Sequence, residues 1–214
     1  MPMRPLAIFG GTFDPVHLGH LCAAWEAAGA LDADVRLMPA NVPPHRPAPV
    51  ADAATRVAIL RAALSDQNRL TIDTRELERE GPSFTVDTLT EFRAEIGPER
   101  PLVLLVGADA FAGLWSWRRW HELFGLAHIG VLTRPGPAMA LDEALEAEVE
   151  PRRCSSAAAL RAAPAGRVLD IRVTAMDISA THIRDELAAG RNPRYLLHAD
   201  LFDDPALLDV YRKA

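Results

Sequence analysis

The chain lacks the features that mark secreted, metal-clustered and membrane-spanning proteins. It has two cysteines, Cys22 and Cys154, which lie far apart and form no Cys-x-x-Cys pair. Neither a disulfide framework nor a zinc–cysteine cluster is therefore expected. The apolar run Leu6–Phe9 near the amino terminus is too short for a signal-peptide core or a membrane span. We expect a cytoplasmic protein in which both cysteines are structural.

The chain also has no excess of positive charge. Its net charge is -6, so no overall field attracts nucleic acid or an anionic membrane, and we expect neither as a partner. An anionic ligand has to be held by local donors.

The sequence leaves a homo-oligomer open. The length of 214 residues is enough for one core. We expect a single domain over residues 1–214, with residues 135–166, rich in Ala, Pro and Glu, as variable surface.

Short β-type runs alternate with helical patterns along the chain. Strands are predicted at 6–9, 35–38, 70–73, 102–106, 127–133 and 168–173, and helices at 17–30, 52–64, 84–96 and 179–189. The run Leu102–Val106 has no polar residue, which is typical of a strand buried on both faces. This order predicts an α/β fold with a doubly wound, mainly parallel sheet and a small carboxyl-terminal helical part. In such a sheet, ligands bind at the carboxyl ends of the strands.

A glycine pair follows the first predicted strand. Gly10 and Gly11 allow a tight turn and a close ligand approach, and the helix behind them offers backbone N–H groups to a phosphate. The pattern is neither G-x-G-x-x-G nor a P-loop, which requires Lys followed by Ser or Thr. His17 and His20 lie three residues apart and share one face of the helix start. Together with His45 they could instead supply three nitrogens to zinc, an alternative that the residues leave open.

Two helix starts carry polar groups. In ISATHIR, Ser179 is predicted to cap the helix, and Thr181 and Arg184 would add a hydroxyl and a guanidinium to a phosphate site. An ordinary capped amphipathic helix is the alternative. In the helix at 52–64, Asp52 is predicted as the cap and Arg56 as a solvent-facing residue.

Two loops complete the set of motifs. In NVPPHR, two prolines stiffen an extended loop that presents His45 and Arg46 together, although a plain proline-rich surface loop is the alternative. Three of the four tryptophans lie within residues 115–120, behind the strand at 102–106. Tryptophans next to an apolar strand belong more often to a core than to a ligand platform.

These motifs together resemble the H-x-G-H nucleotidylyltransferase superfamily, and specifically the bacterial nicotinate-nucleotide adenylyltransferases. The strings occur in that family's order, namely GGTFDPVHLGH, NVPPHR, PSFTVDTL, GADAFAGLWSW, RPG and ISATHIR, and they span most of the chain. The resemblance implies a Rossmann-like nucleotidylyltransferase fold. It also implies condensation of nicotinate mononucleotide with ATP to give nicotinate adenine dinucleotide and pyrophosphate, with Mg²⁺ bound through the ATP phosphates and no metal ligand from the protein.

The resemblance also implies the roles of individual residues. His17, His20 and Arg184 are the expected catalytic residues. ATP is expected to bind Gly10, Gly11, Thr12, Phe13, Gly107, Asp109, Ser179, Thr181 and Arg184. Nicotinate mononucleotide is expected to bind Asn41, His45, Arg46, Thr85, Trp117 and Arg134.

Within the tryptophan cluster, Trp117 falls on the family's nicotinate-stacking position, and Trp115 and Trp120 are assigned to packing. Relatives often have Ser where this chain has Ala180, and Tyr where it has Phe84, so neither position inherits a polar role. Two rival functions stay open. One is another H-x-G-H enzyme, acting on pantetheine phosphate or glycerol phosphate, and the other is a catalytically silent nucleotide-binding relative.

Overall fold

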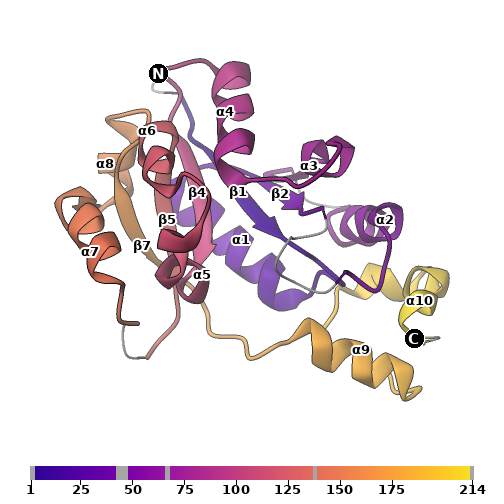
Figure 1. Cartoon of the computed structure of the whole chain (residues 1–214). Helices are drawn as coiled ribbons and strands as arrows, with labels where there is room; N and C mark the ends of the chain where they lie inside the picture. Colours follow the sequence, from indigo (N-terminus) through magenta and orange to yellow (C-terminus); the bar gives the residue numbers. More distant parts are fainter. Residues whose placement is uncertain (1–2, 42–47, 66–67, 137–138, 213–214) are drawn as a thin grey trace.

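A seven-stranded parallel sheet forms the centre of the computed structural model, which describes residues 3–41, 48–65, 68–136 and 139–212 (Figure 1). The strands are β1 (Leu6–Gly11), β2 (Asp34–Pro39), β3 (Leu70–Ile72), β4 (Leu102–Gly107), β5 (His128–Thr133), β6 (Arg153–Cys154) and β7 (Val168–Arg172). Their order is β3-β2-β1-β4-β5-β7-β6, and every neighbouring pair is parallel. The sheet therefore reverses its winding between β1 and β4, which is where an open parallel sheet leaves a ligand crevice.

Helices cover both faces of the sheet. They are α1 (Leu18–Leu31), α2 (Ala53–Ala63), α3 (Arg75–Glu78), α4 (Thr85–Ile96), α5 (Ala108–Ala112), α6 (Leu123–Leu126), α7 (Glu143–Val149), α8 (Ala157–Arg161), α9 (Ala180–Ala188) and α10 (Asp209–Arg212). Short 3-10 turns lie between some of them, among them η1 (Leu114–Ser116), η2 (Trp120–Glu122), η4 (Ala199–Phe202) and η5 (Pro205–Leu208). No helix of the described chain has the length and apolar character needed to cross a membrane.

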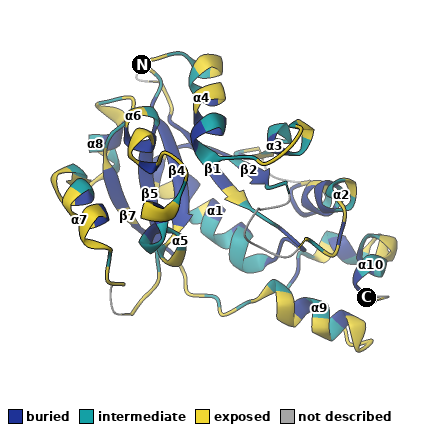
Figure 2. Cartoon of the chain, in the orientation of Figure 1, coloured by how far each residue is buried: buried dark blue, intermediate teal, exposed yellow. Residues whose placement is uncertain are grey.

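The two faces of the sheet bury two separate apolar clusters, as the alternation of side chains along a strand requires. On β1, Ala7 and Phe9 pack with Leu21 of α1 and with residues of α2 and α9. The alternate residues Leu6 and Ile8 pack on the other side with α4, α5, α6 and α7. Figure 2 shows the strands as the most buried part of the molecule. The sequence prediction of a doubly wound parallel sheet is confirmed.

The predicted caps at Asp52 and Ser179 are confirmed as well. The Asp52 carboxylate accepts a hydrogen bond from the Thr55 N–H at 2.7 Å, and the Ser179 hydroxyl accepts one from the His182 N–H at 3.3 Å. Gly97 ends α4 with a φ of 80°, a conformation in which glycine is favoured. The first two caps fix helix starts that follow β2 and β7, at the edge of the sheet where the motif loops lie, whereas Gly97 ends α4 before β4, at the opposite edge.

The prediction that residues 135–166 form a variable surface segment was incomplete. This segment contains the two-residue edge strand β6, which the sequence pattern was too short to reveal. Leu145, Val149 and Leu160 from the same segment are buried in the two apolar clusters.

The prediction that Arg56 faces solvent was wrong. Its side chain is 2% exposed, and Nη1 donates hydrogen bonds of 2.8 Å to the carbonyl oxygens of Thr12 and Ala40. These carbonyls lie just after β1 and β2, so a buried arginine joins the two loops that begin the candidate site.

Candidate functional site

A left-handed turn carries the chain out of β1. Phe13 has a φ of 50°, and its ring is 1% exposed and packs edge-on against Phe9 at 6.0 Å between centroids. A Cβ atom on Gly11 would lie 2.8 Å from the Phe13 ring, so only glycine fits there without a shift of a buried ring. Because the Phe13 side chain is buried, a ligand can reach only its backbone.

The two motif histidines form a stacked pair at the start of α1. Their ring centroids lie 3.7 Å apart with an interplanar angle of 23°. Gly19 leaves them room, since a Cβ atom there would lie 3.1 Å from Nδ1 of His17. No described residue supplies a hydrogen-bond partner to the buried Nδ1 atoms of His17 and His20. A buried polar atom without a partner is costly, so a ligand that supplies a hydrogen bond gains from this site.

Both imidazoles are neutral at pH 7. Burial lowers the pKa of His17 to about 4, and the positive charge of Arg134 contributes to the shift. Burial lowers the pKa of His20 to about 3, helped by His17 and Arg134. A neutral imidazole still carries one N–H group and can donate it to a phosphate oxygen.

We expect the free energy of unfolding to fall as the pH is lowered from 6.5 towards 4. In this interval the histidines of the unfolded chain, with an ordinary pKa of about 6.5, take up protons that folded His17 and His20 do not bind. Protonation then favours the unfolded chain. Denaturant titrations at a series of pH values measure this slope. The double variant His17→Asn/His20→Asn should have a shallower slope, and a slope equal to that of the wild type would contradict the assignment.

A cavity of about 430 Å³ opens beside the histidine pair, and we call it the histidine cavity. Five predicted site residues line it, namely His17, His20, Gly107, Asp109 and Arg134. Asp109 lies in the first turn of α5. Arg134 follows β5, is exposed, and has no hydrogen bond or ion pair within the described chain. Its guanidinium is therefore available to an anion that enters this cavity.

The start of α9 reaches this region through Arg184. Its Nη1 donates to the Asp14 carbonyl oxygen at 2.7 Å, and its Nη2 donates to the Thr181 hydroxyl at 3.1 Å. Ile178, directly before the cap residue Ser179, lines the histidine cavity. The structure thus joins the α9 motif to the loop after β1, whereas Ser179, Thr181 and Arg184 do not themselves line the cavity.

A second cavity of about 280 Å³ adjoins the first, and we call it the tryptophan cavity. Seven predicted site residues line it, namely Gly10, Gly11, Thr12, Asn41, Thr85, Gly107 and Trp117. Phe9 and Gly107 line both cavities, so the two meet at the carboxyl ends of β1 and β4. The amide Nδ2 of Asn41 donates to the Arg79 carbonyl oxygen at 3.4 Å, which ties Asn41 to the loop after α3.

Glu76 lines the tryptophan cavity, and sequence reasoning missed it. Its side chain is 7% exposed, it accepts a hydrogen bond of 2.8 Å from the Thr88 hydroxyl, and burial raises its pKa. In the sequence it is one acid in the charged run RELERE, so nothing distinguished it from a surface residue.

Asp14 anchors the loop between β1 and α1, and it too was missed. Its carboxylate accepts hydrogen bonds from the Val50 N–H at 2.8 Å, the Ala51 N–H at 3.0 Å and the Tyr211 hydroxyl at 2.8 Å. Nη1 of Arg184 lies 3.9 Å from the same carboxylate. Burial and the nearby carboxylate raise the pKa of Tyr211, so the phenol stays protonated and donates. The Asp14 side chain therefore joins Tyr211 of α10, the segment before α2 and Arg184 of α9.

The remaining predictions have mixed outcomes. His45 and Arg46 lie outside the described residues, and with them the third ligand of the zinc alternative. No group of three or more metal-binding side chains occurs in the part of the chain that the structure describes. Trp120 is buried and packs against Phe124, as predicted, but the packing role of Trp115 was wrong, because its side chain is 49% exposed.

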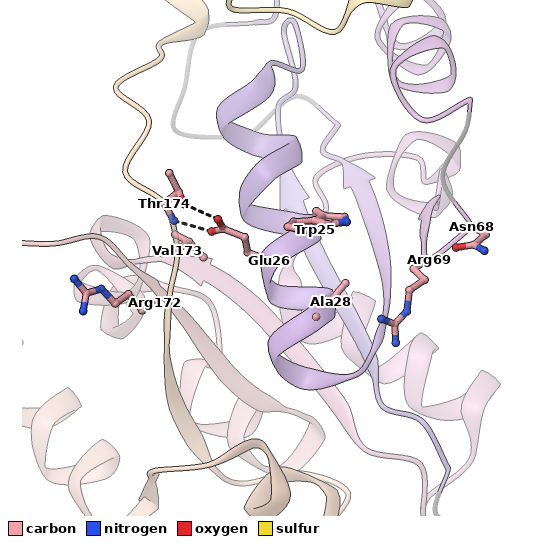
Figure 3. Close-up of a pocket in the computed structure, with 9 residues that line it drawn as sticks. Trp25, Glu26, Ala28, Asn68, Arg69, Arg172, Val173 and Thr174 are labelled. Atoms are coloured by element: carbon pink, nitrogen blue, oxygen red, sulfur yellow. Dashed lines mark hydrogen bonds between the residues drawn. The ribbon is translucent and has the colours of Figure 1, made fainter.

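A third cavity of about 590 Å³ lies over α1 (Figure 3), and none of the predicted site residues line it. It shares Val173 and Thr174 with the histidine cavity. The Glu26 carboxylate accepts hydrogen bonds from the Thr174 N–H at 2.6 Å and from its hydroxyl at 2.5 Å. These bonds fasten α1 to the segment that leads from β7 to α9.

Known proteins share sequence and fold with this chain. Residues 8–186 match a family model described as cytidylyltransferase-like. A protein of Halorhodospira halophila named "Probable nicotinate-nucleotide adenylyltransferase" is 49% identical over 197 residues, which are 92% of this chain and 90% of the relative. A protein of Dechloromonas aromatica with the same name is 44% identical over 215 residues, 99% of each chain.

Solved structures share the fold. The nicotinic acid mononucleotide adenylyltransferase of Plasmodium falciparum, solved in complex with NaAD, matches with a TM-score of 0.68 at 15% identity. The match covers 99% of this chain and 96% of that one. At this identity the likeness concerns the arrangement of the sheet and its helices.

Proposed function

Because this chain belongs to the cytidylyltransferase-like family, we propose that it transfers the adenylyl group of ATP to nicotinate mononucleotide in NAD biosynthesis. The products are nicotinate adenine dinucleotide and pyrophosphate. One observation carries the proposal. Two cavities meet at Phe9 and Gly107, one beside a stacked histidine pair and one beside Trp117. An enzyme that joins two nucleotides needs two such adjoining sites, because the reacting phosphates have to meet.

In this proposal, ATP occupies the histidine cavity. The N–H groups of neutral His17 and His20 donate to phosphate oxygens, and Arg134, which lines the same cavity, adds positive charge. Asp109 can accept from ribose hydroxyls. Arg184, which Asp14 and Thr181 hold beside the loop after β1, is proposed to reach the more distant phosphates together with Ser179 and Thr181. ATP enters with a divalent cation, and we propose Mg²⁺, which binds phosphate oxygens as part of the substrate.

The chemistry needs positioning and neutralisation of charge. A phosphate oxygen of nicotinate mononucleotide attacks the α-phosphorus of ATP, the bond from that phosphorus to the bridging oxygen breaks, and pyrophosphate leaves with the electron pair. The attacking phosphate is already ionised at neutral pH, so no general base is required. Donors that bind the leaving pyrophosphate more tightly in the transition state lower the barrier.

Nicotinate mononucleotide occupies the tryptophan cavity in the same proposal. Its ring stacks on Trp117, and its carboxylate approaches Thr85 at the start of α4. No side chain of the described residues caps this helix start, and the backbone N–H groups of a first helical turn have no acceptor within the helix. A carboxylate matches both the free donors and the dipole there. Asn41, with His45 and Arg46, is proposed to hold the phosphate of this substrate.

Pyrophosphate release tests the proposal. The protein is incubated with ATP and Mg²⁺ plus nicotinate mononucleotide, nicotinamide mononucleotide or phosphopantetheine, with a control that has no acceptor. We expect the fastest release with nicotinate mononucleotide. Release with phosphopantetheine alone would identify a different H-x-G-H enzyme. No release with any acceptor would identify a catalytically silent nucleotide-binding protein.

We expect Trp117→Ala to raise the KM for nicotinate mononucleotide about tenfold and to leave the KM for ATP unchanged. Loss of one aromatic stacking partner costs about 1–3 kcal/mol, and about 1.4 kcal/mol is tenfold in affinity. Steady-state kinetics with each substrate varied in turn measure the effect. Trp115→Ala is the matched control, because that indole is 49% exposed and does not line the cavity. Equal effects of the two substitutions would move the stacking role away from Trp117.

A further inference from the structure

The tryptophan cavity is acidic, although its proposed ligand is an acid. Glu76 is the one charged side chain among the described residues that line it. Nicotinate mononucleotide would add a ring carboxylate and a phosphate to this environment. This inference rests on the proposed function. A positive charge close to the cavity would favour the carboxylate in addition to the backbone donors at the start of α4.

Two of the arginines nearby are already paired. Arg79 forms an ion pair of 2.7 Å with Glu91. Arg119 forms one of 2.6 Å with Glu122 and lies 3.4 Å from Asp87. Their charge is therefore largely compensated where they stand.

Arg118 differs from these two. Within the described chain it has neither an ion pair nor a hydrogen bond, and its guanidinium lies over the Phe84 ring, with Cζ 4.6 Å from the centroid. Its side chain is exposed. A guanidinium that lies on an aromatic face is held in place while its N–H groups stay free to meet a carboxylate.

The position of this contact links it to the cavity from two sides. Arg118 directly follows Trp117 in the chain, and Phe84 lies between Ser83 and Thr85. Trp117, Ser83 and Thr85 all line the tryptophan cavity. Trp117 and Phe84 also pack against the same apolar cluster. The contact thus fixes an unpaired positive charge next to the segments that would hold the pyridine ring.

We propose that Arg118 is a specificity-determining residue that favours a pyridine mononucleotide bearing a ring carboxylate over one bearing a ring carboxamide. Stacking on Trp117 treats the two rings alike. The guanidinium attracts the carboxylate through its full negative charge, whereas the neutral carboxamide has no such attraction. The residue acts on substrate choice and not on the phosphate chemistry.

Isothermal titration calorimetry of nicotinate and nicotinamide mononucleotide with the whole protein tests this directly. We expect Arg118→Gln to weaken binding of the acid about fivefold, the range of an exposed charge pair, and to change the Kd of the amide less than twofold. Arg119→Gln is the matched control, since it removes the neighbouring guanidinium whose charge is already compensated. It should leave the ratio of the two Kd values as in the wild type.

The kinetic counterpart is the ratio of kcat/KM for the acid to that for the amide. It should fall about fivefold in Arg118→Gln, through KM, with kcat retained. An unchanged ratio of Kd values in Arg118→Gln, or an equal change in Arg119→Gln, would overturn the inference. These outcomes are read from binding, so they are distinct from a failure of the proposed function. That failure would appear as binding of the mononucleotide without pyrophosphate release by the wild type.

Discussion

Replacing His20 with alanine is expected to lower kcat by a factor of about 100 to 1,000, the loss that follows removal of one preorganised donor to developing charge. The His20 ring is stacked on His17 at 3.7 Å and meets the Phe13 ring edge-on at 5.1 Å, so its position is set before ligand arrives. A donor that is already in place costs no reorganisation when pyrophosphate begins to leave. The effect should therefore fall on kcat more than on either KM.

Single-turnover and steady-state rates of pyrophosphate release measure this loss, and thermal unfolding checks that the variant is folded. His20→Gln keeps a polar side chain and separates loss of the imidazole from loss of packing against Phe13. His182→Ala is the control, because His182 is an exposed residue of α9, the helix that also carries Arg184. A kcat for His20→Ala within a factor of three of that for His182→Ala would show that His20 does not contribute to the reaction.

The second large effect is expected for Asp14→Ala, which should lower the free energy of unfolding by about 3–5 kcal/mol, because a buried carboxylate that accepts from several donors and lies near a buried guanidinium is lost. The carboxylate accepts three hydrogen bonds. Its negative charge also acts on Arg56, whose guanidinium is buried between two loops. Without Asp14, the N–H groups of Val50 and Ala51 lose their acceptor, and Arg56 loses the negative charge that acts on it most strongly.

Tyr211→Phe gives the matched comparison, because it removes only the hydroxyl that donates to Asp14. It should cost about 1 kcal/mol, the usual net value of one hydrogen bond. Urea unfolding of both variants measures the difference. A loss in Asp14→Ala no larger than that in Tyr211→Phe would show that Arg56 and the two backbone donors do not depend on this carboxylate.

The strands and the main helices could be predicted from the sequence because their patterns are local. The apolar run at 102–106 and the glycine pair after 6–9 are visible in a few residues, and both mark the edge where the cavities meet. The edge strand β6 has two residues, which is too short for any period to appear. Trp115 was assigned to packing from its residue type, while the turn η1 leaves it exposed.

The contacts that hold the site together were beyond sequence reasoning because they join distant residues. Asp14 and Tyr211 are 197 positions apart, and Arg56 donates to carbonyl oxygens 44 and 16 positions away. Backbone carbonyls have no signature in a sequence. An arginine next to the apolar positions of a helix usually faces solvent. Residue type alone therefore led to the wrong prediction that Arg56 is exposed.

At Gly107, folding and function set different limits on the size of the side chain. Apart from its chain neighbours, a Cβ atom at this position would meet no atom of the described residues within 4 Å, and its φ of -67° is open to any residue. It stands, however, where the two cavities meet. A mutation to alanine here is expected to leave the folded state, its abundance and its melting behaviour intact while placing a methyl group in the space where two nucleotides have to touch. In a population of variants, position 107 would therefore harbour defects that no screen for stability or expression detects.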